Sequence, residues 1–176
     1  MRLPLQILVF AVVTVAVVAV AADFVVTEQN APTFYRDFTR LTERPQLVAP
    51  LTATLCINPS GAIVEQEKVM TGPHYRAVVH LYANPVAMPA VTNRTTAFPV
   101  GSVIVKEKLA GDGKVSGVGG MVKRAVGYDA SNGDWEYFYY GKPGDFSSGR
   151  IGSCIDCHRA AKTNDYVYSV RSLPDY

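Results

Sequence analysis

Apolar residues alternate with polar ones, or dominate, in three runs between residues 102 and 140. The runs cover 102–109, 117–128 and 134–140. Gly111-Asp112-Gly113 follows the first run and Asn132-Gly133 precedes the third, and both sequences are typical of tight turns. Because short connections join antiparallel neighbours, the pattern predicts an antiparallel β-meander.

Other segments predict the elements around this sheet. Apolar residues at 34, 35, 38 and 41 are spaced as on one face of a helix, which predicts a helix over 33–47. A Val-rich run over 76–82 predicts another strand, and a short helix is expected from 85 toward 90. A Gly/Ser-rich loop over 141–153 leads into a predicted helix at 154–162, and 165–170 is predicted to form a last edge strand. The predicted fold class is therefore α+β, with a mainly antiparallel sheet, a few flanking helices and a C-terminal helix.

The first 22 residues differ sharply from the rest. Arg2 gives a positive start, residues 5–22 are almost wholly apolar, and Ala19-Val20-Ala21 forms a small-x-small cleavage site. This pattern predicts a signal peptide over 1–21 and a single mature domain over 22–176. An uncleaved anchor helix is the alternative, because about 20 apolar residues can span a bilayer. Both interpretations place the domain outside the cytoplasm, and cleavage would leave it without stable membrane insertion.

The net charge of the chain argues against two classes of binding partner. The whole chain has a formal net charge of +2, and cleavage would remove the positive charge of Arg2. So small a charge argues against a nucleic acid or a charged membrane surface as the partner.

The most specific chemistry lies near the C-terminus, in Cys154-Ile155-Asp156-Cys157-His158. The sequence C-x-x-C-H is typical of c-type haem attachment. Two cysteines three positions apart lie on one face of a helical turn, where both thiols can add to the vinyl groups of one porphyrin. His158 would bind the iron. Since haem c is attached outside the bacterial cytoplasm, the motif and the signal peptide together predict a periplasmic protein with one haem c.

Two other interpretations of the cysteine pair fit the sequence less well. A thioredoxin-like redox pair would open a helix within a βαβ pattern, which this chain lacks. A zinc site would need a second Cys/His pair, and the remaining candidates, Cys56, His74 and His80, are scattered. We interpret Cys56 and His80 as packing residues.

The second axial position of the iron separates electron transfer from gas binding and catalysis. Candidates for a sixth ligand are Met70, Met88, Met121, His74 and His80. None of them lies in a segment that plainly folds over the haem, and a methionine in a strand is typical of core packing. Strand alternation places Lys106 on one face with Ile104 and Lys108, while Val103, Val105 and Glu107 face the other way. Taken alone, Lys106 is most simply a solvent-exposed strand charge.

Residues 72–170 resemble the cytochrome P-460 family, whose relatives include the cytochromes c′-beta. The matching segments follow the family's order, and joined to C-x-x-C-H they are quite specific. They are Gly72-Pro73-His74, Leu81-Tyr82-Ala83-Asn84-Pro85, Phe98-Pro99-Val100-Gly101-Ser102-Val103-Ile104-Val105-Lys106-Glu107, Gly133-Asp134-Trp135, Cys154–His158 and Asp165-Tyr166-Val167-Tyr168.

This resemblance implies a mainly antiparallel fold, a homodimer and a five-coordinate haem with an open distal side. In the namesake enzymes, which oxidise hydroxylamine, a lysine matching Lys106 is bonded to a porphyrin meso carbon. The resemblance therefore makes Lys106 a candidate catalytic and haem-binding residue, and it implies a periplasmic electron acceptor as partner. Some relatives bind nitric oxide instead.

One departure from the family leaves the reaction open. The hydroxylamine-oxidising members carry a distal glutamate at the position of Gly119, and glycine cannot take protons as a general base. His74, near the family's distal-pocket aromatic position, is the candidate replacement. The chain is thus expected to be an oxidoreductase acting on hydroxylamine or nitric oxide. The alternatives are a protein that binds nitric oxide without turnover, with Tyr75, Phe98, Tyr137 and Phe138 supplying an apolar pocket, and an electron-transfer cytochrome.

Overall fold

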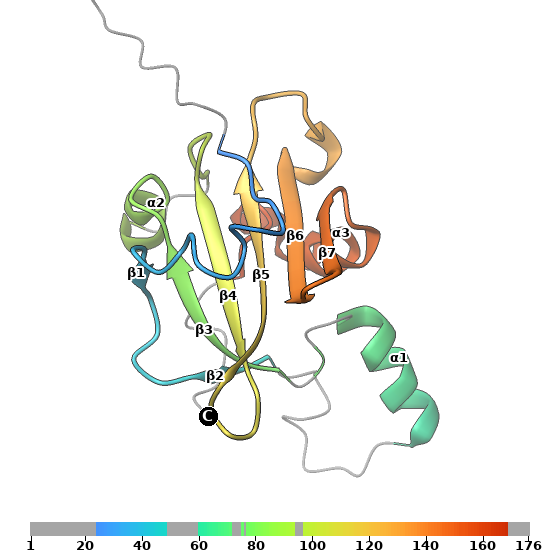
Figure 1. Ribbon diagram of the computed structural model, residues 1–176. Helices are drawn as coiled ribbons and strands as arrows, with labels where there is room; N and C mark the ends of the chain where they lie inside the picture. The colour runs from blue at the N-terminus through green and yellow to red at the C-terminus, as the bar shows by residue number, and fades with distance from the viewer. Residues whose placement is uncertain (1–23, 49–59, 72–74, 76, 94–96, 169–176) are drawn as a thin grey trace, which may run out of the picture.

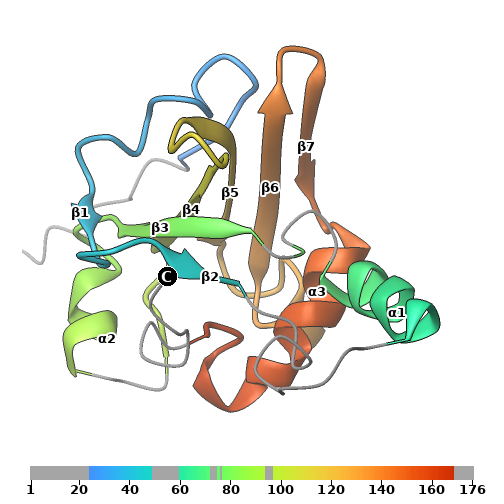
Figure 2. The same ribbon diagram turned by 90° about the horizontal axis from the view of Figure 1, so that it is seen from below.

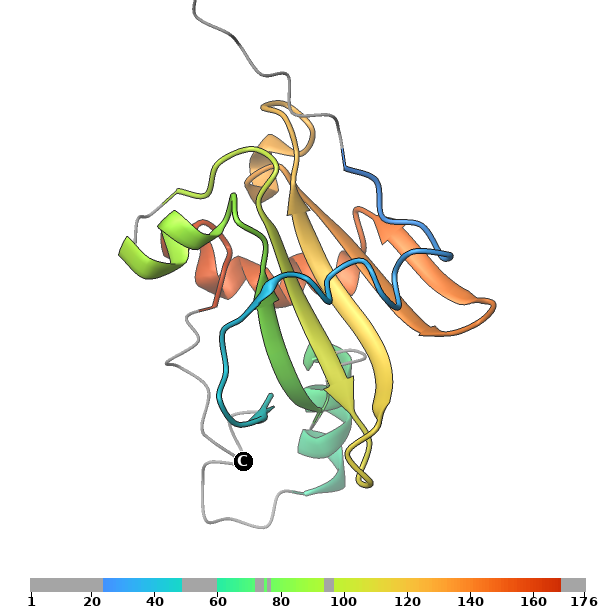
Figure 3. The same cartoon turned by 60° about the vertical axis from the view of Figure 1, so that its left-hand side comes forward.

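The computed structural model describes residues 24–48, 60–71, 75, 77–93 and 97–168. They form one antiparallel sheet whose two faces are covered by different segments of the chain. The segment that precedes β1 crosses one face, and the C-terminal helix lies against the other (Figures 1 and 3).

The sheet is built around five strands that follow one another along the chain. They are β3 (Val78–Ala83), β4 (Val103–Leu109), β5 (Val115–Lys123), β6 (Trp135–Lys142) and β7 (Asp145–Gly149), each antiparallel to its neighbour. Two short strands, β1 (Thr39–Arg40) and β2 (Gln46–Leu47), also pair with β3. The predicted α+β class and the antiparallel meander are confirmed.

Helices cover the ends and one face of this sheet. They are α1 (Gly61–Thr71), α2 (Met88–Asn93) and α3 (Gly152–His158), and the chain continues from α3 as the 3-10 helix η4 (Arg159–Asn164). Helix α1 packs beside α3 (Figure 2). The predicted helix at the cysteine motif is confirmed, and the short helix expected near residue 85 lies slightly further along the chain. Among the residues described, no helix is long and apolar enough to cross a membrane.

The helix predicted over 33–47 is wrong. Residues 28–37 form successive turns, and the chain then extends to pair Thr39 and Arg40 with β3. The side chain of Asn30 accepts a hydrogen bond from the backbone N–H of Thr27 at 2.8 Å and donates one to the carbonyl of Val25 at 3.0 Å. Such local bonds favour turns over a helix, and the apolar side chains of this segment pack on the sheet without one.

Two other predictions at the C-terminal end need correction. The loop expected over 141–153 contains β7, which forms a hairpin with β6. The edge strand predicted over 165–170 is absent from its described part, residues 165–168. Asp165 and Tyr166 instead have φ angles of 51° and 64°, in the left-handed region, which a strand cannot accommodate.

The two faces of the sheet carry separate apolar clusters, as the predicted alternation in β4 requires. Ile104 belongs to a cluster shared with α2, α3 and the C-terminal turn, which we call the α3 face. Val103 and Val105 belong to a cluster shared with the N-terminal segment. The predicted signal peptide, residues 1–21, lies outside the described residues, as do His74 and Cys56.

Candidate functional site

Helix α3 brings the two motif cysteines to the sheet. Cys154 and Cys157 lie one helical turn apart, both have free thiols, and both are half-buried. The Cys154 side chain packs against the apolar cluster of the α3 face, and burial raises the pKa of its thiol. Two thiols on one helical turn, beside an apolar cluster, are well placed to hold one flat, apolar ligand.

His158 ends the same helix and is buried, with 7% of its surface exposed. Its Nδ1 lies 2.6 Å from the carbonyl oxygen of Tyr166. Because a carbonyl only accepts, Nδ1 carries the proton and Nε2 keeps its lone pair. Burial, reinforced by the positive charge of Lys106, lowers the pKa of His158 to about 3. The imidazole is therefore neutral near pH 7, which is the form that binds metals.

Aromatic rings enclose the imidazole. The centroid of the Tyr137 ring lies 5.2 Å from that of His158, and the Tyr168 ring lies at 5.5 Å. Tyr168 also donates a hydrogen bond from its hydroxyl to the carbonyl of Cys157 at 2.7 Å, so the ring is tied to the helix it packs against. The hydroxyl of Tyr137 is buried and has no hydrogen-bond partner among the described residues.

Lys106 lies on the α3 face of β4, in register with Leu81 on one side and Gly119 on the other. The residue is half-buried. Burial lowers the pKa of Lys106, while the thiols of Cys157 and Cys154 act in the opposite direction. Lys106 is thus not a solvent-exposed strand charge. The structure brings it together with Cys154, Cys157 and His158.

The other residues that the sequence offered as iron ligands or as a proton carrier lie in different parts of the fold. Met121 is buried in the α3-face cluster, in the same cross-strand row as Ile104 and Tyr137. His80 lies on the opposite face, where its Nδ1 is 3.0 Å from the Thr42 hydroxyl. Since His74 lies outside the described residues, its predicted role stays a prediction.

The aromatic residues expected to line the pocket divide between the two faces. Phe98 and Tyr137 belong to the α3-face cluster, but Phe138 packs on the opposite face, because it adjoins Tyr137 in β6. Sequence reasoning did not single out Tyr166 or Tyr168 as site residues. The Asp165–Tyr168 segment could have pointed to these two tyrosines, because it is one of the segments that resemble the family, but we interpreted it as an edge strand.

These residues fit a haem. Two thiols on one helical turn can reach one porphyrin edge, and the neutral His158 offers Nε2 as an axial ligand. The aromatic side chains and the apolar cluster match a large planar ligand, and the Tyr137 hydroxyl is a buried polar atom without a partner among the described residues.

Comparison with known proteins agrees with this arrangement. The family model for cytochrome P460 matches residues 61–169, which include α1, the strands from β3 to β7 and the cysteine motif in α3. A search of curated proteins gave no significant match. The family match covers more than half of the chain. The chain therefore belongs to the cytochrome P460 family of haem proteins.

Proposed function

We propose that this chain is an exported c-type cytochrome with one haem and an open iron site, acting as an oxidoreductase on hydroxylamine or nitric oxide. The convergence of Lys106, Cys154, Cys157 and His158 on the α3 face supports the proposal most directly. The haem would supply the redox chemistry and an iron position for a small nitrogen ligand.

The protein residues have distinct roles in this proposal. The thiols of Cys154 and Cys157 would each add across one vinyl group, which would form a thioether and need no oxidant. His158 would hold iron through Nε2, while Nδ1 keeps its hydrogen bond to Tyr166. His74 is the proposed carrier of protons on the distal side.

Lys106 is the proposed nucleophile for a bond to the porphyrin. Its pKa is lowered by burial, and thioether formation would remove the thiols that oppose this effect. Only the neutral form of the amine has the lone pair that can bond to carbon. Such a bond would replace one N–H and one meso C–H and release two electrons and two protons, so it would form only where an external two-electron oxidant, such as a peroxide, takes up the electrons during maturation.

A second function is supported by the residue opposite Lys106. Gly119 carries no side chain, so the position that holds a proton acceptor in hydroxylamine-oxidising relatives offers none here. A protein of this kind would bind nitric oxide at the iron without turning it over. The electron-transfer alternative would need Met121 or His74 as a sixth ligand. Met121 is packed in the core, which weakens that choice, and His74 lies outside the described residues.

The absorption spectrum of the ferrous, haem-loaded protein tests the proposal first. A strongly red-shifted, broad Soret band supports the Lys106 bond, and hydroxylamine-dependent reduction of an electron acceptor then supports the enzyme. An ordinary high-spin c-type Soret band that responds to carbon monoxide favours gas binding. A sharp low-spin spectrum insensitive to added ligands contradicts both and favours electron transfer.

Covalent attachment has its own test. Denatured wild-type protein is expected to carry the mass of one haem. Cys154→Ser and Cys157→Ser together release the haem on denaturation, and Cys56→Ser, outside the motif, serves as the control. Retention of the haem by the double variant contradicts attachment through the motif.

Location and assembly complete the proposal. The chain is proposed to be periplasmic and cleaved after Ala21, to form a homodimer and to pass electrons to a periplasmic acceptor. Strand β7 is one edge of the sheet, and an edge strand suits pairing between subunits. Intact mass of the exported protein tests the cleavage, and light scattering tests the dimer. A monomer at working concentration contradicts the assembly.

A further inference from the structure

The turn after η4 has an unusual backbone conformation, and it is hydrogen-bonded directly to His158. Asp165 and Tyr166 both have left-handed φ angles, 51° and 64°. Asp tolerates this region, but it is rare for a bulky residue such as tyrosine. The carbonyl of Tyr166 is the group that accepts the hydrogen bond from His158 Nδ1. A strained turn thus places the acceptor for the histidine, and other contacts must hold that turn.

Asp165 is fixed by three separate groups. Its carboxylate accepts hydrogen bonds from Lys123 Nζ at 2.6 and 2.7 Å and from the backbone N–H of Phe98 at 2.8 Å. Its carbonyl accepts one from the indole N–H of Trp135 at 2.8 Å. The side chains of Lys123 and Asp165 are 13% and 11% exposed, so this ion pair is largely shielded from water.

Tyr166 is held from the other side. Its hydroxyl donates to the carbonyl of Ser131 at 2.8 Å, and its ring covers Gly133. A Cβ at Gly133 would lie 2.6 Å from a carbon of that ring, so the close approach requires glycine. The Gly133-Asp134-Trp135 segment, found first as a sequence motif, therefore docks directly on the Asp165–Tyr166 turn.

We propose that Lys123, Asp165, Trp135 and Gly133 form a proximal clamp that tunes the iron through His158. They are positioning residues, since they act through the Tyr166 carbonyl and His158. The clamp keeps the carbonyl 2.6 Å from Nδ1. A strong acceptor on one ring nitrogen makes the other a stronger donor to iron, which favours the ferric state and lowers the reduction potential. This inference rests on the proposed assignment of His158 as the axial ligand.

The test compares two clamp variants with a matched control in haem-loaded protein. Lys123→Met removes the cation, and Asp165→Asn removes the anion while keeping a residue that tolerates left-handed φ. Glu136→Gln breaks the neighbouring pair of Arg124 and Glu136, which joins the residue after β5 to β6 and is similarly buried, with side chains 13% and 17% exposed. The Arg124 side chain donates to Glu136 and to the carbonyl of Phe24, and not to the turn beside His158.

The readouts are the iron–histidine stretching frequency of the ferrous protein, by resonance Raman, and the midpoint potential. Lys123→Met and Asp165→Asn are expected to lower the frequency and raise the midpoint potential. Glu136→Gln is expected to lower thermal stability with both readouts unchanged. If Lys123→Met does not fold, Asp165→Asn provides the same test.

The outcomes separate this inference from the proposed function. If wild-type protein shows an iron–histidine mode that His158→Ala abolishes, the axial assignment holds. The clamp is then overturned if its variants shift the two readouts no more than Glu136→Gln does. If the ferrous wild-type protein has a five-coordinate haem but lacks the mode, the axial assignment fails, and the clamp fails with it.

Discussion

Lys106 and Gly119 lie directly opposite each other in the antiparallel strands β4 and β5, on the face that carries α3. Directly opposed residues in a sheet share one face and are close enough for their side chains to interact. Lys106, the candidate for a bond to the porphyrin ring, thus has a position without a side chain as its cross-strand neighbour in β5.

Gly119→Glu is expected to raise hydroxylamine-dependent reduction of an electron acceptor. The carboxylate would stand beside Lys106 and take protons as N–H bonds are oxidised, and a positioned general base contributes roughly 100-fold or more to a rate. Gly119→Gln, of similar size without a base, is the control and is expected to stay near wild type. Equal rates for both variants would mean that a base at this position does not limit the reaction.

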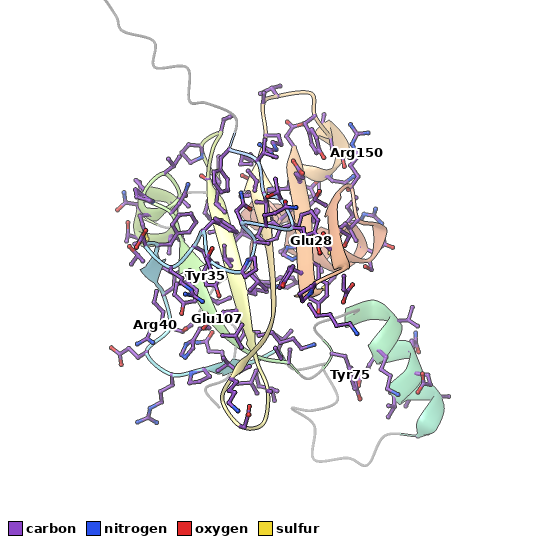
Figure 4. All side chains as sticks on the ribbon, in the orientation of Figure 1. Glu28, Tyr35, Arg40, Tyr75, Glu107 and Arg150 are labelled. Atoms are coloured by element: carbon purple, nitrogen blue, oxygen red, sulfur yellow. The ribbon has the colours of Figure 1, made fainter. Side chains whose placement is uncertain are left out.

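Glu107, next to Lys106 in β4, faces the other side of the sheet and binds two tyrosines. The Tyr35 hydroxyl donates to its carboxylate at 2.6 Å and the Tyr82 hydroxyl donates at 3.2 Å. Tyr35 and Glu107 lie side by side, with Arg40 nearby (Figure 4). Since hydrogen bonds to charged groups contribute about 1.5–3 kcal/mol, Tyr35→Phe is expected to lower the free energy of unfolding by roughly that amount at pH 7.

Tyr35 also leads us to expect that the stability of the protein falls at alkaline pH. Burial, and then the hydrogen bond and the charge of Glu107, raise the pKa of Tyr35 above its ordinary value of 10.0. A raised pKa means that the folded protein keeps a proton that the unfolded chain releases above pH 10. The stabilisation is therefore complete below about pH 10 and is lost as the pH rises further. Denaturant titrations from pH 8 to 11 should show a steeper loss in wild type than in Tyr35→Phe, and parallel curves would contradict this.

Gly133→Ala is expected to destabilise the protein more than Gly144→Ala. Both glycines have positive φ angles, 69° and 82°, so alanine is strained at either position. Only at Gly133 would the new Cβ also meet the ring of Tyr166, whereas nothing lies within 4 Å at Gly144. Gly133→Ala should lower the free energy of unfolding by about 1–3 kcal/mol more than its control. Equal losses would show that the ring moves freely.

The sequence predicted the meander and the cysteine helix because both follow from local patterns. Turn sequences and alternation determine the central strands, and C-x-x-C-H determines the spacing of the two cysteines and the histidine. The faces of β4 were also predictable, since period-2 alternation places Lys106 with Ile104.

Helix α1 and strand β7, which the sequence analysis did not predict, lack such local patterns. Helix α1 leaves Ile63 and Val69 exposed at 40% and 76%, and the buried residue among its described side chains is Glu67. Its sequence therefore shows no apolar stripe. Strand β7 contains two serines and a glycine, which have low strand propensity, and it is defined by its register with β6.

The acceptor for His158 could not be predicted for a related reason. It is a backbone carbonyl, whose position depends on the left-handed turn at Asp165 and Tyr166. That turn is held by Trp135, Lys123 and Gly133, which are distant in sequence. Tertiary contacts of this kind leave no local signal in the chain.

Tyr137→Phe is expected to stabilise the haem-free protein. The Tyr137 side chain is 1% exposed, and its hydroxyl has no hydrogen-bond partner among the described residues. A buried hydroxyl that has lost water without gaining a partner destabilises a protein by about 1–3 kcal/mol, so its removal should raise the free energy of unfolding. Tyr166→Phe is the matched control, because that hydroxyl donates to the Ser131 carbonyl at 2.8 Å and its removal should lower stability by about 1 kcal/mol. Urea titrations of both variants, made in a Cys154→Ser, Cys157→Ser background without haem, measure the two effects. If Tyr137→Phe is destabilising there, the Tyr137 hydroxyl has a hydrogen-bond partner in the haem-free chain. The hydroxyl would then not need a polar group of the haem as its partner.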